Sequence, residues 1–458
     1  GRAPDQQSLA VLPFADLSPE RNQEYFSDGL SEQLLNELAK FPNWRVIGKT
    51  SSFRFKGKTG DVSEIGRQLN VGAILEGSVR KQGNRARVSV QLIKTADGFQ
   101  LWSATFDRDM GDIFAVQDEI TRAVAGALGA LGKGGGAKAG SQAVAKANGE
   151  AYNAYLQGRY FLQRGNKENY DKALEYFERA TKLAPEYAPG WIGLGQVSAS
   201  LADWGFAPVG ESYARARQAI DKALALDPGA AQAHGALGAI KMLHDWDWTG
   251  ADQALRRGLE LEPTNGDVLF ASAVLARIQG RFDDAVALHR RQIGVDPLNP
   301  TAHHDYGLTL HYAGREDEAK AELAKSLELS PELANSHSLL SRVYLAQSNP
   351  EKALAEVEQE PHPVFRLCGL GVAYYASGRT RDADRSLAEL LEKYKTVAPY
   401  QIAEVYAFRK ELDRAFEWLD RARTERDAGL TEMKADPLLK SLRGDARFDR
   451  MLRDLKLL

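Results

Sequence analysis

Cysteine is almost absent from this sequence, and other features that would indicate a particular chemistry are missing with it. The single cysteine, Cys368, excludes an intramolecular disulfide and a cysteine-based zinc site. No run of about 18 apolar residues is present, so we expect no segment of the sequence to insert directly into a membrane. The net charge is −3, and residues 1–131 carry 16 basic and 16 acidic residues. This balance lacks the basic footprint of a DNA-binding domain, so no nucleic-acid partner is expected.

Motifs for catalysis are also missing. No Gly-x-Ser-x-Gly elbow occurs in the sequence. The pair Gly132-Lys133 does not belong to a phosphate-binding loop, because Ala127 stands where the first glycine is needed and Gly134 replaces Ser or Thr. Cys368 lies in an apolar helical pattern, where an inert thiol is expected. We therefore predict that this chain is not an enzyme and holds no cofactor.

The eight histidines are the remaining candidates for a metal site. His304 and His311 share one face of a predicted helix, but no carboxylate follows them at the spacing of a ligand. His234, His303 and His337 recur at nearly the same position of a sequence repeat. Recurrence in register favours packing over metal binding, so no metal site is predicted.

The dominant feature of the sequence is a repeat of 34 residues. Prolines that end predicted helices recur at intervals of 43, 35, 34 and 34 residues, each with an alanine 12 residues before it: Pro185, Pro228, Pro263, Pro297 and Pro331, after Ala173, Ala216, Ala251, Ala285 and Ala319. Small residues at fixed positions let paired antiparallel helices approach closely. The pattern, including Trp191-x2-Leu194-Gly195, is the tetratricopeptide signature. We predict an all-α superhelical solenoid of about eight repeats over residues 150–425, with capping helices over 426–458.

Residues 1–131 lack this period and alternate between strand and helix patterns. Apolar or alternating runs predict five strands, at residues 8–14, 44–53, 73–81, 85–94 and 99–106. Helical spacing marks three further segments, at residues 22–41, 61–69 and 112–131, and Asp61 is a predicted N-cap. The order βαβαβββα predicts an α/β domain with one sheet, whose last three strands form an antiparallel meander.

Five phrases of this region resemble the FlgO/TolB-amino-terminal-like domain of bacterial signalling proteins. They are L-A-V-L-P-F at 9–14, E-Y-F-S-D-G-L at 24–30, V-I-G-K-T-S-S-F at 46–53, E-G-S-V at 76–79 and F-A-V-Q-D-E-I at 114–120. In that family the domain is followed by tetratricopeptide repeats. The pair commonly sits C-terminal to a class III adenylate/guanylate cyclase domain or a CadC-like winged-helix domain, often after one transmembrane helix. The resemblance implies a regulatory region, and it carries over no catalytic residue.

Two expectations concern the ends of the predicted domains. The chain does not begin with Met and enters a strand pattern near Ser8, so we expect it to be cut from a longer protein. If a membrane helix precedes it, the resemblance implies the periplasmic side of a bacterial inner membrane, with a cytoplasmic location as the alternative. Gly132–Gly149 has four glycines within five residues and predicts a flexible linker. A helix running straight through is the other reading, which the helical cost of glycine disfavours.

A tetratricopeptide stack presents one face of each first helix to a concave groove. Counting from the small position of each repeat places these side chains on that face: Gln232, Met242, Phe270, Arg277, His304, His311, Tyr312, Asn335, Ser338, Arg342, Tyr375 and Tyr400. Aromatic rings, Arg and Asn suit an extended peptide or a partner helix. We therefore predict a protein or peptide partner, and homo-oligomerisation stays open. The alternative is that these side chains are solvated or bind the chain's own N-terminal domain.

The α/β domain has one local candidate for a ligand. Four residues end a predicted strand and two cations follow: Lys49, Thr50, Ser51 and Ser52, then Arg54 and Lys56. Hydroxyls, backbone N–H groups and cations at the carboxyl end of a strand can hold an anion, although a solvated loop is the plainer reading. The leading hypothesis is a non-catalytic interaction region whose α/β domain relays or docks. The alternative is a small-molecule or anion sensor that controls an attached cyclase or transcription-regulator domain.

Overall fold

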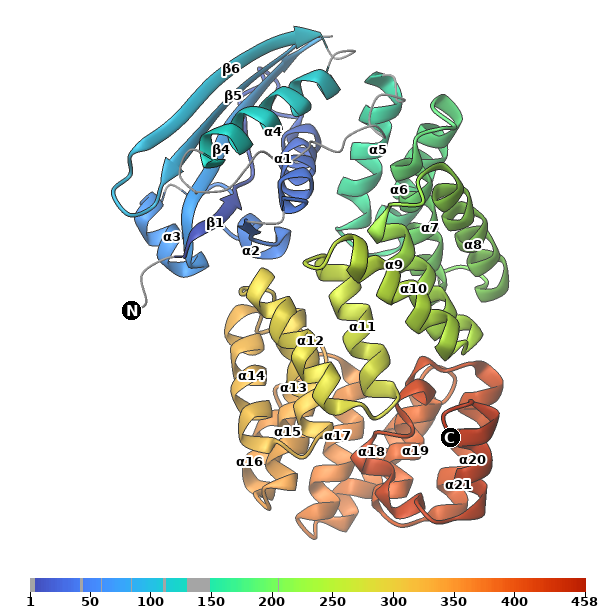
Figure 1. Ribbon diagram of the computed structural model, residues 1–458. Helices are drawn as coiled ribbons and strands as arrows, with labels where there is room; N and C mark the ends of the chain where they lie inside the picture. The colour runs from blue at the N-terminus through green and yellow to red at the C-terminus, as the bar shows by residue number, and fades with distance from the viewer. Residues whose placement is uncertain are drawn as a thin grey trace. The chain divides into compact units, whose positions relative to one another are not determined.

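The computed structural model describes residues 5–41, 44–58, 60–83, 85–109, 113–129, 149–204 and 206–458 (Figure 1). The chain divides into two compact units. The first comprises Gly1–Ile240, Gln253–Val268 and Gly294–Leu298, and the second comprises Lys241–Asp252, Leu269–Ile293 and Asn299–Leu458. The predicted linker lies outside the described residues except for Gly149. Among the described residues, no helix is both long and apolar enough to cross a membrane.

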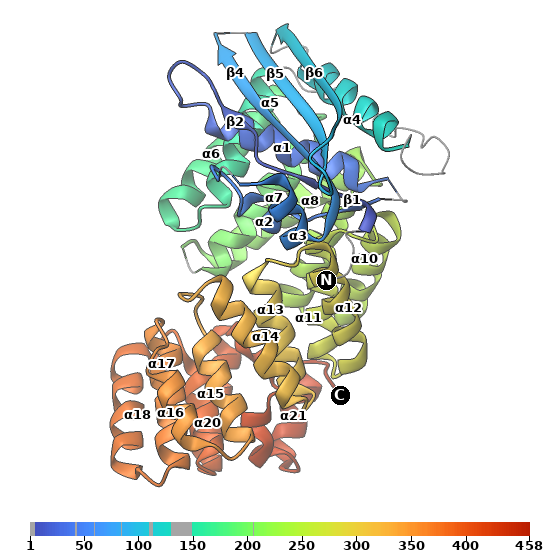
Figure 2. The same ribbon diagram turned by 90° about the vertical axis from the view of Figure 1, so that its left-hand side faces the viewer.

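The first unit contains one mixed sheet. Its strands run in the order β3 (Arg45–Val46), β1 (Asp5–Val11), β4 (Val71–Gln82), β5 (Arg85–Lys94) and β6 (Gln100–Asp109), and β2 (Ala15–Asp16) pairs with β4. β1 is parallel to β3 and β4, whereas β4, β5 and β6 form the predicted antiparallel meander, visible side by side in Figure 2. The predicted α/β class is therefore confirmed. The predicted strand at 44–53 is wrong beyond residue 46, because Lys49–Phe53 forms helix α2.

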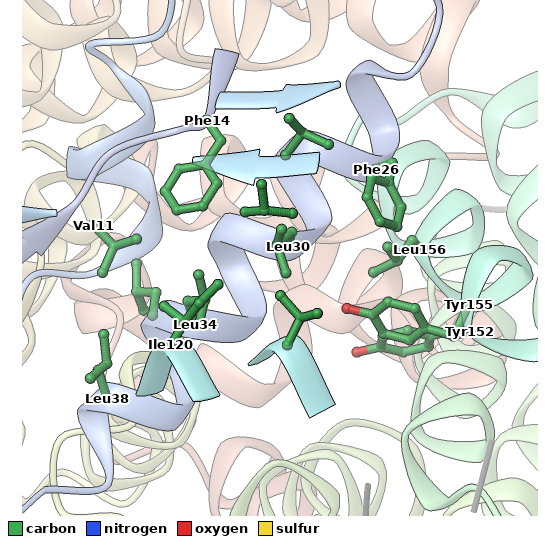
Figure 3. Close-up of a cluster of buried hydrophobic side chains, with 14 of the residues drawn as sticks. Val11, Phe14, Phe26, Leu30, Leu34, Leu38, Ile120, Tyr152, Tyr155 and Leu156 are labelled. Atoms are coloured by element: carbon green, nitrogen blue, oxygen red, sulfur yellow. The ribbon is translucent and has the colours of Figure 1, made fainter. Parts of the chain in front are cut away.

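Alternating side chains of β1 send apolar groups to both faces of this sheet. Leu9 and Val11 belong to a core shared with α1 (Glu24–Ala39) and α4 (Ile113–Gly129), as Figure 3 shows for Val11, Leu34 and Ile120. The opposite face packs under α3 (Val62–Leu69) and under Ile47 and Phe55, which flank α2. The Asp61 carboxylate accepts a hydrogen bond from the Ser63 backbone N–H at 3.0 Å, which confirms the predicted N-cap.

The rest of the described chain is largely helical, and six pairs of consecutive helices pack against each other. The pairs are α5 (Gly149–Leu162) with α6 (Lys167–Leu183), α7 (Ala188–Asp203) with α8 (Val209–Leu226), α13 (Pro300–Tyr312) with α14 (Glu316–Leu329), α15 (Ser336–Ala346) with α16 (Pro350–Val357), α17 (Pro363–Ala376) with α18 (Thr380–Tyr394), and α19 (Pro399–Phe408) with α20 (Leu412–Glu425). Between the second and third of these pairs, the alternation of first and second helices continues through α9 (Ala231–Ile240, continued by the π-turn η3, Lys241–Asp245), α10 (Trp248–Leu261), α11 (Gly266–Ile278) and α12 (Phe282–Val295). The first helix of each pair has an odd label and the second an even one.

Small residues are placed where first and second helices touch. A Cβ atom on Gly195 would lie 2.7 Å from the Ile220 side chain, and one on Gly307 would lie 2.6 Å from Leu323 Cγ. Both distances are too short for carbon atoms, so only glycine permits these helix separations. The buried alanines Ala216 and Ala319 occupy the facing second helices.

The chain changes character after α20. Arg426 adopts a left-handed backbone with φ of 54°, which ends the helix. Two 3-10 turns follow, η4 (Ala428–Glu432) and η5 (Pro437–Leu442), and then one α-helix, α21 (Ala446–Asp454). The predicted capping helices are therefore mostly 3-10 turns. We call Ala428–Leu442 the tail segment.

Candidate partner-binding groove

The predicted groove residues lie on first helices or at their ends, but few are exposed. Tyr375 on α17 is the most open, with 37% of its surface accessible. A second group is half-buried: Gln232, Phe270, His304, Tyr312 and Asn335. A third group is buried: Met242, Arg277, His311, Ser338, Arg342 and Tyr400. For the buried members, the expectation of a freely accessible groove is wrong, because other parts of the chain cover them.

Arg277, at the end of α11, is bound by the tail segment. Its Nε and Nη2 atoms donate to the two carboxylate oxygens of Glu432, at 3.1 and 2.7 Å. Nη1 lies 3.5 Å from Asp305 on α13. Burial alone would lower the pKa of Arg277, but the charges of Glu432 and Asp305 hold it above its ordinary value. The fork geometry makes this a charge-assisted, bidentate contact within the second unit.

A second buried pair lies farther along the same set of helices. Arg342 on α15 donates to both carboxylate oxygens of Glu404 on α19, at 2.8 and 3.0 Å. Cys368 Sγ is 3.5 Å from Glu404 Oε2, and burial raises the pKa of this thiol well above its usual range. The thiol is thus protonated and enclosed, as the sequence predicts for an inert cysteine.

Asp436 of the tail segment adds another carboxyl group to this cluster. It accepts hydrogen bonds from the Tyr400 hydroxyl at 3.0 Å and from the Leu438 backbone N–H at 2.8 Å. Burial, together with the neighbouring charge of Glu404, raises the pKa of Asp436 to about 7. The cluster therefore holds two acidic groups and one arginine, Arg342, in a dry environment.

Apolar contacts accompany these polar ones. The tail segment buries four large side chains completely: Leu430, Met433, Leu439 and Leu442. The Ser441 hydroxyl donates to the Ala407 carbonyl on α19 at 2.6 Å. Sequence patterns missed this docking, because its partners are separated from the tail segment by up to 155 residues. The acidic residues Glu432 and Asp436, four residues apart among apolar ones, were the available signal in the sequence.

Two of the three repeat histidines form carboxylate pairs in register, whereas His234 Nε2 contacts the Pro228 carbonyl at 3.0 Å. His303 Nδ1 lies 2.6 Å from Glu322, and His337 Nδ1 lies 2.9 Å from Glu356, so the two pairs join equivalent positions of successive repeats. His289 instead contacts Thr309 at 3.0 Å, and burial lowers its pKa to about 4. No group of three or more metal-ligating side chains was found in the described ranges.

The predicted ligand loop of the α/β domain is occupied by the chain's own carboxylates. Lys49 Nζ lies 2.6 Å from Glu32, and Lys56 Nζ binds both Glu24 and Asp28. The Ser51 backbone N–H donates to Asp296 at 2.7 Å, in a segment of the same compact unit. The prediction of an open loop is therefore wrong, since these residues form helix α2 and an internal contact. Thr50 and Ser52 belong to the same helix, and Arg54 follows it directly.

Helix α1 carries an acidic stripe that faces the first repeat. Glu24, Asp28 and Glu32 recur every four residues and therefore share one face. Within the first unit, Glu32 binds Arg159 of α5 and accepts from Gln163 at 3.1 Å, and Glu24 accepts from the Tyr160 hydroxyl at 2.9 Å. The stripe is not among the predicted sites, although its four-residue spacing is visible in the sequence.

Glu32 is the most enclosed member of the stripe, with 5% of its surface accessible. Burial would raise its pKa, but the charges of Arg159 and Lys49 outweigh burial and lower the pKa to about 2. Apolar packing surrounds this contact: a Cβ atom on Gly29 would lie 2.6 Å from Leu156, and Figure 3 shows Tyr152 and Leu156 of α5 beside Phe26 and Leu30 of α1. The α/β domain is thus docked on the first repeat by both charge and packing.

Two family models match the sequence. The HilA/YgeH-like transcriptional regulator, second domain, matches residues 5–123, and the tetratricopeptide repeat matches residues 164–187 and 300–333. The helical part is a tetratricopeptide solenoid. The match to the α/β domain names a different family from the FlgO/TolB-amino-terminal-like one, so that resemblance is not confirmed.

One curated relative and several solved structures are similar to parts of the chain. "Putative adenylate cyclase 3" of Rhizobium meliloti (strain 1021) is 32% identical over 319 residues, which are 69% of this chain and 42% of the relative. This chain therefore spans less than half of that relative. PilF of Pseudomonas aeruginosa is 19% identical, covering 45% of this chain and 91% of its own, with a TM-score of 0.37. PilW, a type IV pilus biogenesis factor, is 18% identical, covering 46% and 96%, with a TM-score of 0.39.

Proposed function

We propose that this chain is the non-catalytic regulatory and protein-interaction region of a bacterial signalling protein. In this proposal the repeats bind a protein or peptide, and the docked α/β domain relays that event to an attached effector domain. The observation that carries the proposal is the buried contact of Glu32 with Lys49 and Arg159, which ties α1 and α2 of the α/β domain to α5 of the first repeat.

The physical reason is coupling through a charged, enclosed contact. A buried carboxylate that loses one of its cations becomes strongly unfavourable, so a small shift of α5 relative to α1 changes the energy of the interface by several kcal/mol, on the order of 3. A movement of the first repeat would thus be felt by the α/β domain. The same movement at a solvent-exposed ion pair would change the interface energy far less, because solvent screens the charges.

The attached effector is also part of the proposal. The relative is named an adenylate cyclase, and the family model that matches the α/β domain belongs to a transcriptional regulator. Both names describe proteins with a signalling output, which supports a regulatory role for the region they share with this chain. A location on the periplasmic side of the inner membrane stays a proposal that rests on the FlgO/TolB-like resemblance. The alternative of an anion sensor is not favoured, because Lys49, Ser51 and Lys56 already bind carboxylates.

Cleavage between the domains tests the docking directly. We expect a chain with a protease site inserted among residues 132–148 to remain one complex on gel filtration after it is cut, because the α1–α5 interface holds the fragments together. The substitution Arg159→Glu should separate the cut fragments, since Glu32 would then face a second carboxylate. The matched control Arg67→Glu, on the exposed surface of α3 with 66% of its side chain accessible, should leave them together.

The same pair of variants tests the relay in the natural protein with its effector domain attached. Arg159→Glu should change the effector's basal output, and Arg67→Glu should not. Fragments that part in the unsubstituted chain would contradict docking. If Arg159→Glu abolishes docking and Arg67→Glu preserves it, but the two variants have the same basal effector output, the relay is contradicted.

A further inference from the structure

The tail segment hydrogen-bonds to side chains on two first helices of the second unit. Glu432 meets Arg277 of α11, and Asp436 meets Tyr400 of α19. Arg342 of α15 and Tyr312 of α13 also lie close enough to Asp436 to interact electrostatically. These side chains come from first helices, the ones that line the groove of a tetratricopeptide array. The tail segment therefore occupies the place where a bound peptide is expected.

The polar contacts of the tail segment resemble those by which a protein recognises a specific ligand. Closing the end of a helical array requires only apolar contact with the last pair. Here the Glu432 carboxylate is held by the bidentate fork of Arg277, and four residues later the Asp436 carboxyl group accepts a hydrogen bond from the Tyr400 hydroxyl. Buried ion pairs contribute little net stability compared with apolar packing, whereas they discriminate strongly against ligands that lack the charge.

We propose that the inner face formed by α11, α13, α15 and α19 is a binding site for an acidic segment that carries a carboxylate and, four residues later, a hydrogen-bond-accepting carboxyl or amide side chain, and that Ala428–Leu442 occupies it as an intramolecular ligand. A partner protein with such a segment displaces the tail segment by offering the same contacts. This inference names the partner class of the proposed function and rests on it. It concerns the second unit alone, so its failure is distinguishable from failure of the α1–α5 docking.

Hydrogen exchange on the intact, unsubstituted chain is the first test. We expect backbone amides of residues 428–442 to exchange through a local opening, roughly tenfold or more faster than those of α13 and α15 in the same sample. A synthetic peptide with the sequence of residues 428–442, added in excess, should leave α13 and α15 protected while the chain's own tail exchanges faster still. If the tail exchanges only at the rate of α13 and α15, the segment is a fixed part of the core and the proposal is wrong.

Binding in trans is the second test. The full chain with Glu432→Ala should bind the fluorescently labelled peptide roughly tenfold or more tightly than the unsubstituted chain, because its own tail competes less well. Lys440→Ala, an exposed position on the same segment, is the matched control and should bind like the unsubstituted chain.

The peptide itself also supplies a control. A peptide with Glu432→Gln should lose the binding, because its neutral side chain cannot pair with the Arg277 guanidinium. Equal affinity of the Glu432→Ala and Lys440→Ala chains, retention of binding by the Glu432→Gln peptide, or loss of folded structure in the Glu432→Ala chain would each overturn the proposal. The last outcome would show that the segment is required for the fold.

Discussion

Replacing Arg342 with alanine should destabilise the second unit by about 3–5 kcal/mol, the cost typical of leaving a buried charge without its partner. Arg342 and Glu404 are 8% and 3% exposed, and Arg342 is the cation that contacts both oxygens of Glu404. Without it, Glu404 would lie beside the carboxyl group of Asp436 and the thiol of Cys368 in a dry site. Urea-induced unfolding followed by circular dichroism measures the loss.

Two further variants show whether charge is the cause. Arg342→Met combined with Glu404→Gln should recover most of the lost stability, because it removes both charges and keeps the volume nearly constant. Arg414→Ala breaks an exposed ion pair with Glu417, whose side chains are 63% and 62% accessible, and should cost at most about 1 kcal/mol. An Arg342→Ala chain no less stable than Arg414→Ala would contradict the buried cluster.

The stability of the second unit should fall as the pH rises from about 4 to about 7, and Asp436→Asn should abolish most of that fall. The pKa of Asp436 is about 7 in the folded chain and has an ordinary value of 3.8. Between these values the folded state holds a proton that the unfolded state releases, so unfolding becomes easier with each unit of pH. The accumulated loss is on the order of 4 kcal/mol.

Asparagine retains the acceptor for the Tyr400 hydroxyl and the Leu438 backbone N–H but carries no charge at any pH. The Asp436→Asn chain should therefore be the more stable one at pH 8. Glu32 is a control with the opposite pH dependence, because its pKa is lowered to about 2 in the folded chain. Its contribution to the free energy of unfolding is present at neutral pH and is lost as the pH falls through about 4 and below. If the unfolding free energy of the Asp436→Asn chain falls with pH as steeply as that of the unsubstituted chain, Asp436 is not the group responsible for the pH dependence.

Local sequence signals predicted the elements whose packing repeats. The 34-residue period located the helix pairs, and Gly195 and Gly307 stand where a Cβ atom would collide with the partner helix. The register of His303 and His337 predicted a structural role, and each side chain meets a glutamate 19 residues later. Such features depend on neighbours in the sequence, which is why periodicity was sufficient.

Contacts between distant segments were beyond the reach of the same patterns. Arg277 and Arg342 were predicted to face a partner, but whether a cation on a first helix meets solvent, a partner or the chain itself depends on residues as far away as Glu432. Lys49–Ser52 continues an apolar strand pattern, yet it forms a short helix whose Ser51 binds Asp296, 245 residues later. In both places tertiary contacts override the local pattern.

A double-mutant cycle between Arg277 and Glu432 tests the central claim, that carboxylates of the chain itself bind the cations on the inner face of its repeats. Arg277→Ala, Glu432→Ala and the double variant would be compared in urea-induced unfolding. The account predicts a coupling energy of about 2 kcal/mol or more, since the contact is bidentate and buried. Additive effects, with coupling below about 0.5 kcal/mol, would mean that the two side chains do not bind each other and would contradict the account.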